Sequence, residues 1–193
     1  STFCLPNDAS NQKVPYNIDI NYFVGGQKVM GYKKMKLANA WMDPTFMKQV
    51  ISAKIYQEYL PTGESNLVKL FSQGNYVGMY VNDESINKQF LDKHFDEKNG
   101  PLFKCDNIDR FCDTAGAPSA MPPNLNFLGD DSTLYYNSYD MKSDHGWTEL
   151  VDLIRTIVYE FQNIDSVLNV DRTLWAFAAN QTLQNLDCYN TYY

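Results

Sequence analysis

The sequence lacks any apolar run long enough to cross a membrane, and it has no surplus of basic residues. A membrane-spanning helix needs roughly 20 consecutive apolar residues, and no stretch of the 193-residue chain approaches that length. Its 16 lysines and arginines are outnumbered by 23 aspartates and glutamates, which gives a formal net charge of −7. This balance argues against a nucleic acid as the main partner, and it also disfavours an anionic membrane surface.

Histidine is scarce, and this limits metal and nucleophile chemistry. The chain has 2 histidines, His94 and His145, and each stands apart from the cysteines. A zinc site needs closely spaced pairs of Cys or His, and a Ser-His-Asp or Cys-His arrangement needs a histidine that can activate a nucleophile. Neither kind of site is supported by these positions.

The 4 cysteines leave the redox state open. Cys105 and Cys112 enclose a short polar loop, so a disulfide between them is plausible, although four cysteines allow three pairings and buried free thiols are the alternative. Disulfides would indicate an exported protein, and we expect the chain to be secreted or at the cell surface. The chain begins without Met and without a recognisable signal peptide, which indicates a processed or longer precursor.

Apolar residues are plentiful enough for a globular core, and their periodicity divides the chain into a strand-rich part and a helical part. The composition is 44% hydrophobic and 15% aromatic, which is typical of a folded domain. Residues 113–145 have the composition of a long loop. The remaining elements follow from the spacing of apolar residues and from turn and capping signals. We expect strands at 16–22, 28–37, 67–71 and 76–81, and helices at 44–60, 86–95, 147–161 and 171–183.

The order of these elements distinguishes between two kinds of nucleotide-binding fold. Open α/β sheets alternate strand and helix and carry a Gly-rich turn after the first strand, and this chain has neither feature. A small sheet followed by helices is instead the layout of a protein kinase-like fold. We predict an α+β protein with a sheet lobe that includes one helix at residues 1–83 and a helical lobe at 84–193, joined near Asn82-Asp83-Glu84.

Several short segments carry a family resemblance that extends over essentially the whole chain. They are Gly31–Asn39, Asp43–Lys48, Val68–Phe71, Gly74–Tyr80, Phe90-Leu91, Gly100–Lys104, Trp147–Leu150 and Asn185-Leu186-Asp187. In this order they resemble the spore-coat protein H (CotH) family of secreted atypical kinases. The resemblance implies a partial kinase-like domain, shortened at both ends, whose partners would be a protein substrate and the missing remainder of its own domain.

The resemblance also implies a reaction and a set of residues. Phosphoryl transfer needs a metal-bound nucleotide, cations that neutralise phosphate charge and an acid that orients the nucleophilic hydroxyl. The cofactor would be ATP with Mg or Mn. By resemblance, Asp187 is the catalytic acid, Asn190 is a metal ligand, and Lys13, Glu84 and Lys104 bind the nucleotide.

Each of these residues also has an ordinary structural interpretation. Asp187 could simply close a helix C-terminal turn, and Lys13 and Lys104 could be solvated strand residues. Glu84 could be an acid at a helix N-terminus that complements the helix dipole. A basic cluster on the second strand is most simply a solvated face; it comprises Lys28, Lys33, Lys34 and Lys36.

One departure from the family pattern bears on catalysis. The first helix usually starts with Arg-Glu in the family, whereas this chain has Lys48-Gln49. If that acid pairs with a phosphate-binding lysine, its loss favours a non-catalytic pseudokinase that acts as a surface-coat, adhesion or scaffold-binding module. A carbohydrate-binding module is a weaker alternative, suggested by the 14 tyrosines and the acidity.

Overall fold

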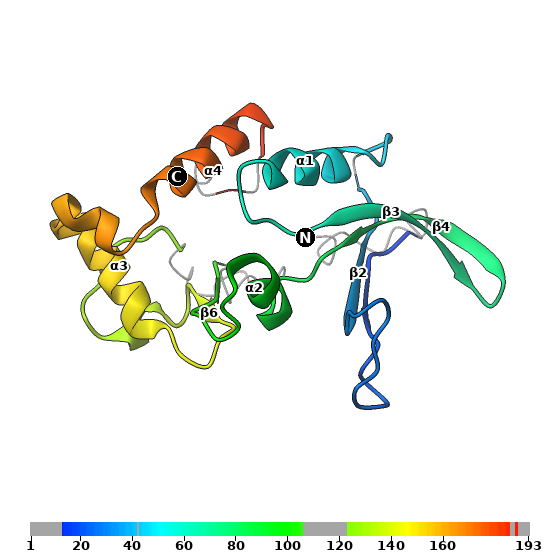
Figure 1. Ribbon diagram of the computed structural model, residues 1–193, viewed down its shortest axis with the longest axis horizontal. Coiled ribbons are helices and arrows are strands. Elements are labelled where there is room, and N and C mark those ends of the chain that lie inside the picture. The colour runs from blue at the N-terminus through cyan, green and yellow to red at the C-terminus, as the bar shows by residue number, and fades with distance from the viewer. Residues whose placement is uncertain (1–12, 42, 106–122, 186–187, 189–193) are drawn as a thin grey trace, which may run out of the picture. The chain divides into compact units, whose positions relative to one another are not determined.

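The protein is α+β, with a small antiparallel sheet and several helices, as the sequence predicts. A computed structural model describes residues 13–41, 43–105, 123–185 and 188 (Figure 1). These residues fall into two compact units, which we call the N-terminal unit (13–95) and the C-terminal unit (96–188). None of the described helices is long and apolar enough to cross a membrane.

The N-terminal unit is built on one four-stranded sheet in the order β1-β2-β4-β3, with every neighbouring pair antiparallel. Its elements are β1 (Tyr16–Asp19), β2 (Lys34–Ala38), α1 (Lys48–Gln57), β3 (Ser65–Ser72), β4 (Asn75–Asp83) and α2 (Lys88–Phe95). The β3–β4 hairpin is confirmed. It turns at Gln73 (φ 50°) and Gly74 (φ 81°), the two positive φ angles of a type I′ turn, whose twist matches that of the flanking strands.

The first two strands are shorter than predicted. β1 ends at Asp19 and β2 begins only at Lys34, so that residues 20–33 form a loop between them (Figure 1). At the start of this loop, local hydrogen bonds replace the pairing between strands. The Asn21 backbone N–H donates to Asp19 Oδ1 at 3.0 Å, and the Gly26 backbone N–H donates to Asn21 Oδ1 at 2.5 Å. Asn and Asp side chains compete with regular structure in this way.

Helix α1 begins later than predicted. The expected start at Pro44 is wrong, because Phe46 has a left-handed backbone (φ 60°) and the helix begins at Lys48. Asp43, which precedes Pro44, nevertheless serves the start of the helix. Its Oδ2 accepts from the Lys48 N–H at 2.9 Å and its Oδ1 accepts from the Thr45 N–H at 3.0 Å, so it serves free amides at the helix start.

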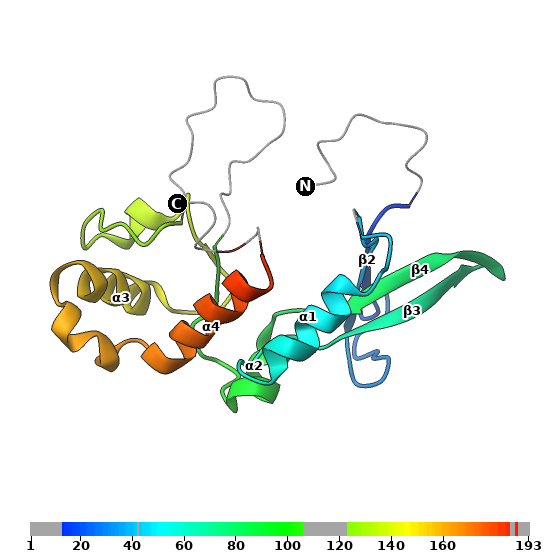
Figure 2. The same ribbon diagram turned by 90° about the horizontal axis from the view of Figure 1, so that it is seen from above.

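Helix α1 buries little of its apolar face, although apolar residues at helical spacing indicate a face that packs on a core. The helix lies along β3 (Figure 2), and of its residues only Val50 is buried, whereas Ile51 and Ile55 are exposed. The periodicity of apolar residues predicts the helix and its face, but it does not show what covers that face. The core of the unit lies instead under β2, β4 and α2, where Leu37, Tyr80, Val81, Phe90 and Leu91 are buried.

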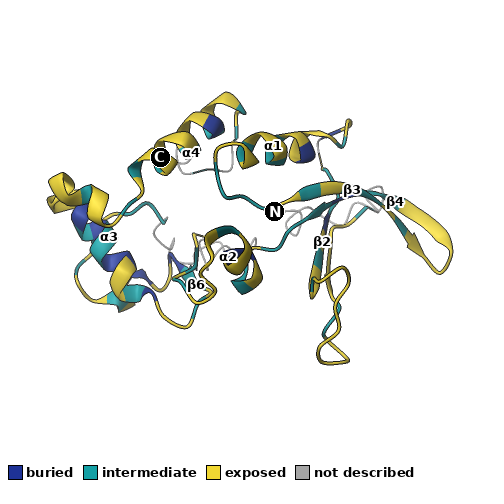
Figure 3. Cartoon of the chain, in the orientation of Figure 1, coloured by how far each residue is buried: buried dark blue, intermediate teal, exposed yellow. Residues whose placement is uncertain are grey.

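The C-terminal unit is mainly helical, and its two predicted helices are confirmed (Figure 3). Its elements are β5 (Phe103–Lys104), the 3-10 helix η2 (Ser132–Tyr135), β6 (Asp140–Met141), α3 (Trp147–Tyr159), the 3-10 helix η3 (Phe161–Ser166) and α4 (Val170–Thr182). Its core combines two tyrosines with one face of α3: Tyr135, Tyr139, Leu150, Val151 and Ile154. The Tyr135 and Tyr139 hydroxyls accept backbone N–H bonds from Leu128 and Leu125, each at 2.9 Å. The described end of the predicted long loop is therefore anchored to this core.

Candidate functional site

The structure describes three of the five predicted site residues. Asp187 and Asn190 lie outside the described residues. Lys13 and Glu84 both lie in the N-terminal unit, whereas Lys104 lies in the C-terminal unit. The roles predicted for all five residues stay predictions, and the geometry around Lys13 and Glu84 shows what each can do.

Lys13 lies just before β1, where it is held on the sheet by aromatic rings and a backbone carbonyl. Its Nζ donates to the Asn39 carbonyl at 2.8 Å, and Asn39 Nδ2 donates back to the Lys13 carbonyl at 2.8 Å. The same Nζ lies 4.1 Å from the centroid of the Phe46 ring and 4.9 Å from that of Tyr80. Cation–π contacts of this kind hold an ammonium without neutralising its charge.

The Lys13 ammonium has no carboxylate partner among the described residues. Burial lowers its pKa, because desolvation disfavours the charged form. An ammonium has three N–H donors, and only one of them bonds to a described residue, the Asn39 carbonyl. A partly desolvated cation with unused donors is chemically suited to bind an anion such as a phosphate group.

Two features beside Lys13 also fit a ligand site. Tyr80 is fully buried, and its hydroxyl has no well-formed hydrogen bond within the described part of the chain, the neighbouring Tyr16 phenol being a weak partner. Burial raises the pKa of Tyr80, and the charge of Tyr16 and that weak hydrogen bond raise it further. Buried polar atoms nearly always have a partner. Phe46 reaches Lys13 from a strained left-handed backbone (φ 60°), and such strain concentrates at functional sites.

Glu84 follows β4, and its buried carboxylate is the centre of a partly exposed ionic cluster. Its carboxylate is 4% exposed. Its Oε1 lies 3.3 Å from Lys93 Nζ, and its Oε2 lies 3.0 Å from His94 Nε2 and accepts from the Glu64 N–H at 3.1 Å. Lys93 completes the cluster with Glu64 Oε1 at 2.9 Å and the Tyr32 hydroxyl at 3.2 Å.

The cluster keeps Glu84 ionised in spite of its burial. Burial alone would raise the pKa of Glu84, but hydrogen bonds from His94 and from the Glu64 amide, together with the charge of Lys93, outweigh it and lower the pKa. The pKa of Lys93 is raised in return, because its acidic partners outweigh its own desolvation. The carboxylate thus joins the end of β4 to α2, and both of its oxygens already have partners within the protein.

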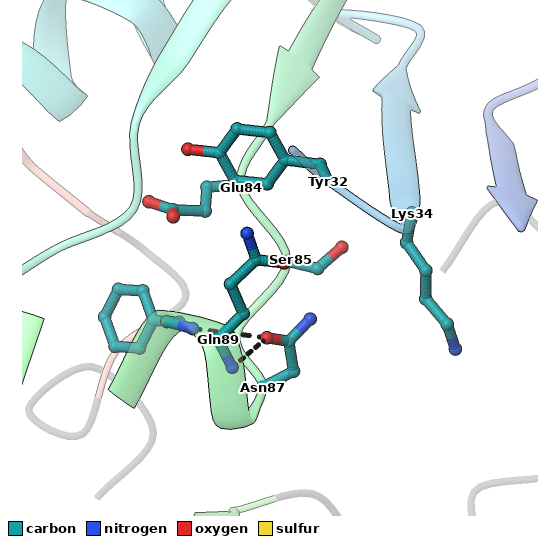
Figure 4. Close-up of a pocket in the computed structure, with 7 residues that line it drawn as sticks. Tyr32, Lys34, Glu84, Ser85, Asn87 and Gln89 are labelled. Atoms are coloured by element: carbon teal, nitrogen blue, oxygen red, sulfur yellow. Dashed lines mark hydrogen bonds between the residues drawn. The ribbon is translucent and has the colours of Figure 1, made fainter. Parts of the chain in front are cut away.

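The interpretation of Glu84 as a helix N-terminal acid is wrong. Its partners Lys93 and His94 lie in the last turn of α2, and the start of that helix is served by Asn87. The Asn87 side-chain oxygen accepts from the Gln89 N–H at 2.8 Å and from the Phe90 N–H at 3.2 Å (Figure 4). Next to this cap is a small hollow whose lining comes from the start of β2 and the residue Tyr32 before it, the segment between β4 and α2, and the start of α2. It is lined by Tyr32, Lys34, Glu84, Ser85, Asn87, Gln89 and Phe90.

The comparison with known families agrees with this fold. The model of a family described as CotH kinase protein matches residues 7–193. The chain belongs to the CotH kinase protein family. Membership makes it a kinase-like protein, as the sequence motifs predict. No curated protein matches the chain significantly.

Gln49 stands where the family resemblance leads us to expect an acid, and it bonds within the N-terminal unit. Gln49 Nε2 donates to Asp83 Oδ2, and Ser65 Oγ donates to Asp83 Oδ1 at 2.8 Å. Burial raises the pKa of Asp83, and the Ser65 hydrogen bond opposes that shift. Gln49 therefore holds the start of α1 to the end of β4. Local sequence patterns do not indicate this contact, because the two residues lie 34 positions apart.

Lys104 and the cysteines contribute less to a site. Lys104 is exposed on β5, opposite Asp140 of β6. Cys105 follows it with a free thiol, which does not support the predicted disulfide with Cys112, a residue outside the described part of the chain. Cys188 donates from its thiol to the Asn185 carbonyl at 2.9 Å.

No metal site is visible in the described segments. They contain no group of three or more His, Cys, Asp or Glu side chains that could hold a metal ion. The predicted ligand Asn190 and the nearby Asp187 carry oxygen donors, which are the donors that Mg²⁺ prefers.

Proposed function

We propose that this protein is an exported CotH-family kinase that transfers phosphate from a metal-bound nucleoside triphosphate to a hydroxyl group of a protein. The observation that carries this proposal is the Lys13 ammonium, which is partly desolvated, held by rings and without a described carboxylate partner. In this account Lys13 binds phosphate oxygens of ATP. The sheet lobe thus supplies a cation that neutralises phosphate charge.

The remaining roles follow the requirements of phosphoryl transfer. The reaction depends on positioning and on neutralisation of phosphate charge rather than on covalent chemistry by the protein. Asp187 orients the nucleophilic hydroxyl and accepts its proton, and Asn190 helps to hold Mg or Mn. Glu84 shapes the nucleotide site from the end of β4, and Lys104 supplies a further positive charge.

The Gln49–Asp83 contact supports a second candidate, a pseudokinase that serves as a surface-coat, adhesion or scaffold-binding module. An acid at position 49 could pair with a phosphate-binding lysine, but Gln49 instead bonds to Asp83. A neutral amide cannot hold an ammonium in the same way. In this alternative the nucleotide site has lost its catalytic arrangement, and α1 stays fixed to the sheet by a structural hydrogen bond.

Phosphate transfer by the full-length protein distinguishes the two candidates. We expect incorporation of phosphate from ATP with Mg²⁺ or Mn²⁺ into protein, and we expect Asp187→Ala to abolish it while nucleotide binding is retained. Nucleotide binding without transfer by the intact protein would favour the pseudokinase. Transfer that survives Asp187→Ala would contradict the role assigned to Asp187.

A further inference from the structure

The loop at residues 20–33, which we call the 20–33 loop, presents large apolar side chains to solvent. Figure 1 shows it extending from β1 and β2 away from the rest of the sheet, and Figure 3 shows it almost entirely exposed. Phe23 is 93% exposed and Met30 is 94% exposed, with Tyr22, Val24 and Val29 also exposed. Isolated exposed apolar residues are ordinary, but a group of them on one protruding loop usually marks an interaction site.

The loop has a defined conformation. Val29 and Tyr32 exchange two backbone hydrogen bonds of 2.9 Å around Met30 and Gly31, which have φ angles of 50° and 88°. These features describe a type I′ turn. This turn is held by α2, where Gln89 Nε2 donates to the Gly31 carbonyl at 3.2 Å.

Met30 is unfavourable for folding in two respects. A type I′ turn prefers Asn, Asp or Gly at this position, because other residues are strained at positive φ. The side chain is also 94% exposed, so it gains almost nothing from burial in return. Neither cost is offset by burial within the described chain, so the Met30 side chain is available to a partner outside it.

The charge around the loop differs in sign from that of the whole chain. No aspartate or glutamate occurs from residue 20 to residue 41, although the formal net charge of the chain is −7. This segment contains Lys28, Lys33, Lys34 and Lys36, all exposed. Lys34 lies 3.7 Å from Asp19, whereas Lys28 and Lys33 form no ion pair with a described residue. The carboxylates next to the loop are paired, Asp19 with Lys34 and Glu84 with Lys93 and His94. Charges more than about 10 Å away are largely screened in physiological salt, so the cations without a described partner that the loop offers are Lys28 and Lys33.

We propose that the 20–33 loop docks on an anionic lipid bilayer, with Phe23 and Met30 inserted shallowly and the lysines at the headgroups. Aromatic and aliphatic side chains flanked by lysines are the arrangement that interfacial membrane anchors use. Two nearly fully exposed side chains on a protrusion need a partner that surrounds them. A bilayer surrounds any inserted side chain, whereas a protein partner would need a matching pocket for each.

Co-sedimentation with vesicles tests this proposal without reference to nucleotide or catalysis. We expect the protein to bind vesicles of phosphatidylcholine mixed with phosphatidylserine and not vesicles of phosphatidylcholine alone. Phe23→Ser should lower the partition coefficient roughly ten-fold or more, from the loss of an inserted ring. Lys28→Gln and Lys33→Gln should each lower it roughly five-fold.

Met30→Asn separates binding from folding. Asn suits the turn better, so the midpoint of thermal unfolding should stay the same or rise, while the vesicle affinity falls. Phe71→Ser is the matched control, because Phe71 is another exposed phenylalanine, 57% exposed near the tip of the β3–β4 hairpin. This substitution should leave vesicle binding unchanged. Absence of binding to mixed vesicles, or equal losses from Phe23→Ser and Phe71→Ser, would overturn the proposal. Binding to soluble polyglutamate that shows the same variant pattern would also overturn it, in favour of an acidic protein partner.

Discussion

At the scale of single residues, the ionised Glu84 carboxylate is the clearest stabilising feature of the N-terminal unit. Its bonds to Lys93, to His94 and to the Glu64 amide are charge-assisted and largely shielded from water. Glu84→Gln keeps the shape but removes the charge, and we expect it to lower the free energy of unfolding by about 2 kcal/mol. Urea denaturation at neutral pH measures this change. Asp92→Asn on the exposed side of α2 is the control and should cost less than about 0.5 kcal/mol.

The same residue predicts a pH dependence. Because folding lowers the pKa of Glu84, its contribution to stability is complete above the ordinary carboxyl pKa of 4.5 and is lost as the pH falls through the lower folded-state value. The unfolding free energy of the wild type should therefore fall in acid more steeply than that of Glu84→Gln. Denaturation curves measured from neutral pH into acid test this, and parallel profiles for the two proteins would show that Glu84 is not the titrating group.

Residue identities alone account for only part of the candidate site. The family resemblance identifies Lys13 and Glu84 as candidate site residues. It does not show that aromatic rings contact the Lys13 ammonium, or that Lys93 and His94 bond to the Glu84 carboxylate. The sequence does not predict the contact between Gln49 and Asp83 either. Such partners are distant along the chain, and they meet only because the order of strands in the sheet brings them together.

At the scale of secondary-structure elements, the start of α3 depends on a glycine. Gly146 precedes the helix with φ 145°, and a Cβ at this position would lie 2.8 Å from Phe103 Cε2 and 3.0 Å from Pro101 Cβ. We expect Gly146→Ala to lower the free energy of unfolding by about 2 kcal/mol, from backbone strain and this clash. Chemical denaturation of Gly146→Ala beside Gly25→Ala provides the measurement. A Cβ at Gly25 would have no neighbouring atom within 4 Å, so comparable losses at both glycines would contradict the steric explanation.

The elements differ in how well local sequence predicts them. The β3–β4 hairpin, α3 and α4 are predicted closely, because a Gly-containing turn or a strong apolar periodicity lies within each segment. The lengths of β1 and β2 are overestimated, since Asn21 and the turn after Val29 replace strand pairing with local hydrogen bonds. The exposed face of α1 shows a second limit of sequence-based prediction. Periodicity predicts that the helix has an apolar face, but it does not predict which residues pack against that face.

At the scale of the whole molecule, overall charge is a poor guide to what the protein binds. The net charge of −7 argues against anionic partners, yet the Lys13 ammonium and the lysines around the 20–33 loop form two local positive sites in the N-terminal unit. The first fits the phosphate groups of a nucleotide, and the second fits an anionic surface. Both sites depend on where the lysines lie in the structure, and the net charge of the chain does not show this.

Calorimetric titration of the protein with ATP and Mg²⁺ tests directly whether the Lys13 site binds a nucleotide. We expect saturable binding that Lys13→Met weakens roughly ten-fold to a hundred-fold, the loss expected for one charge-assisted contact. Lys69→Met, on the exposed face of β3, is the matched control and should bind as the wild type does. No binding by the wild type, or equal affinities for wild type and Lys13→Met, would contradict the account.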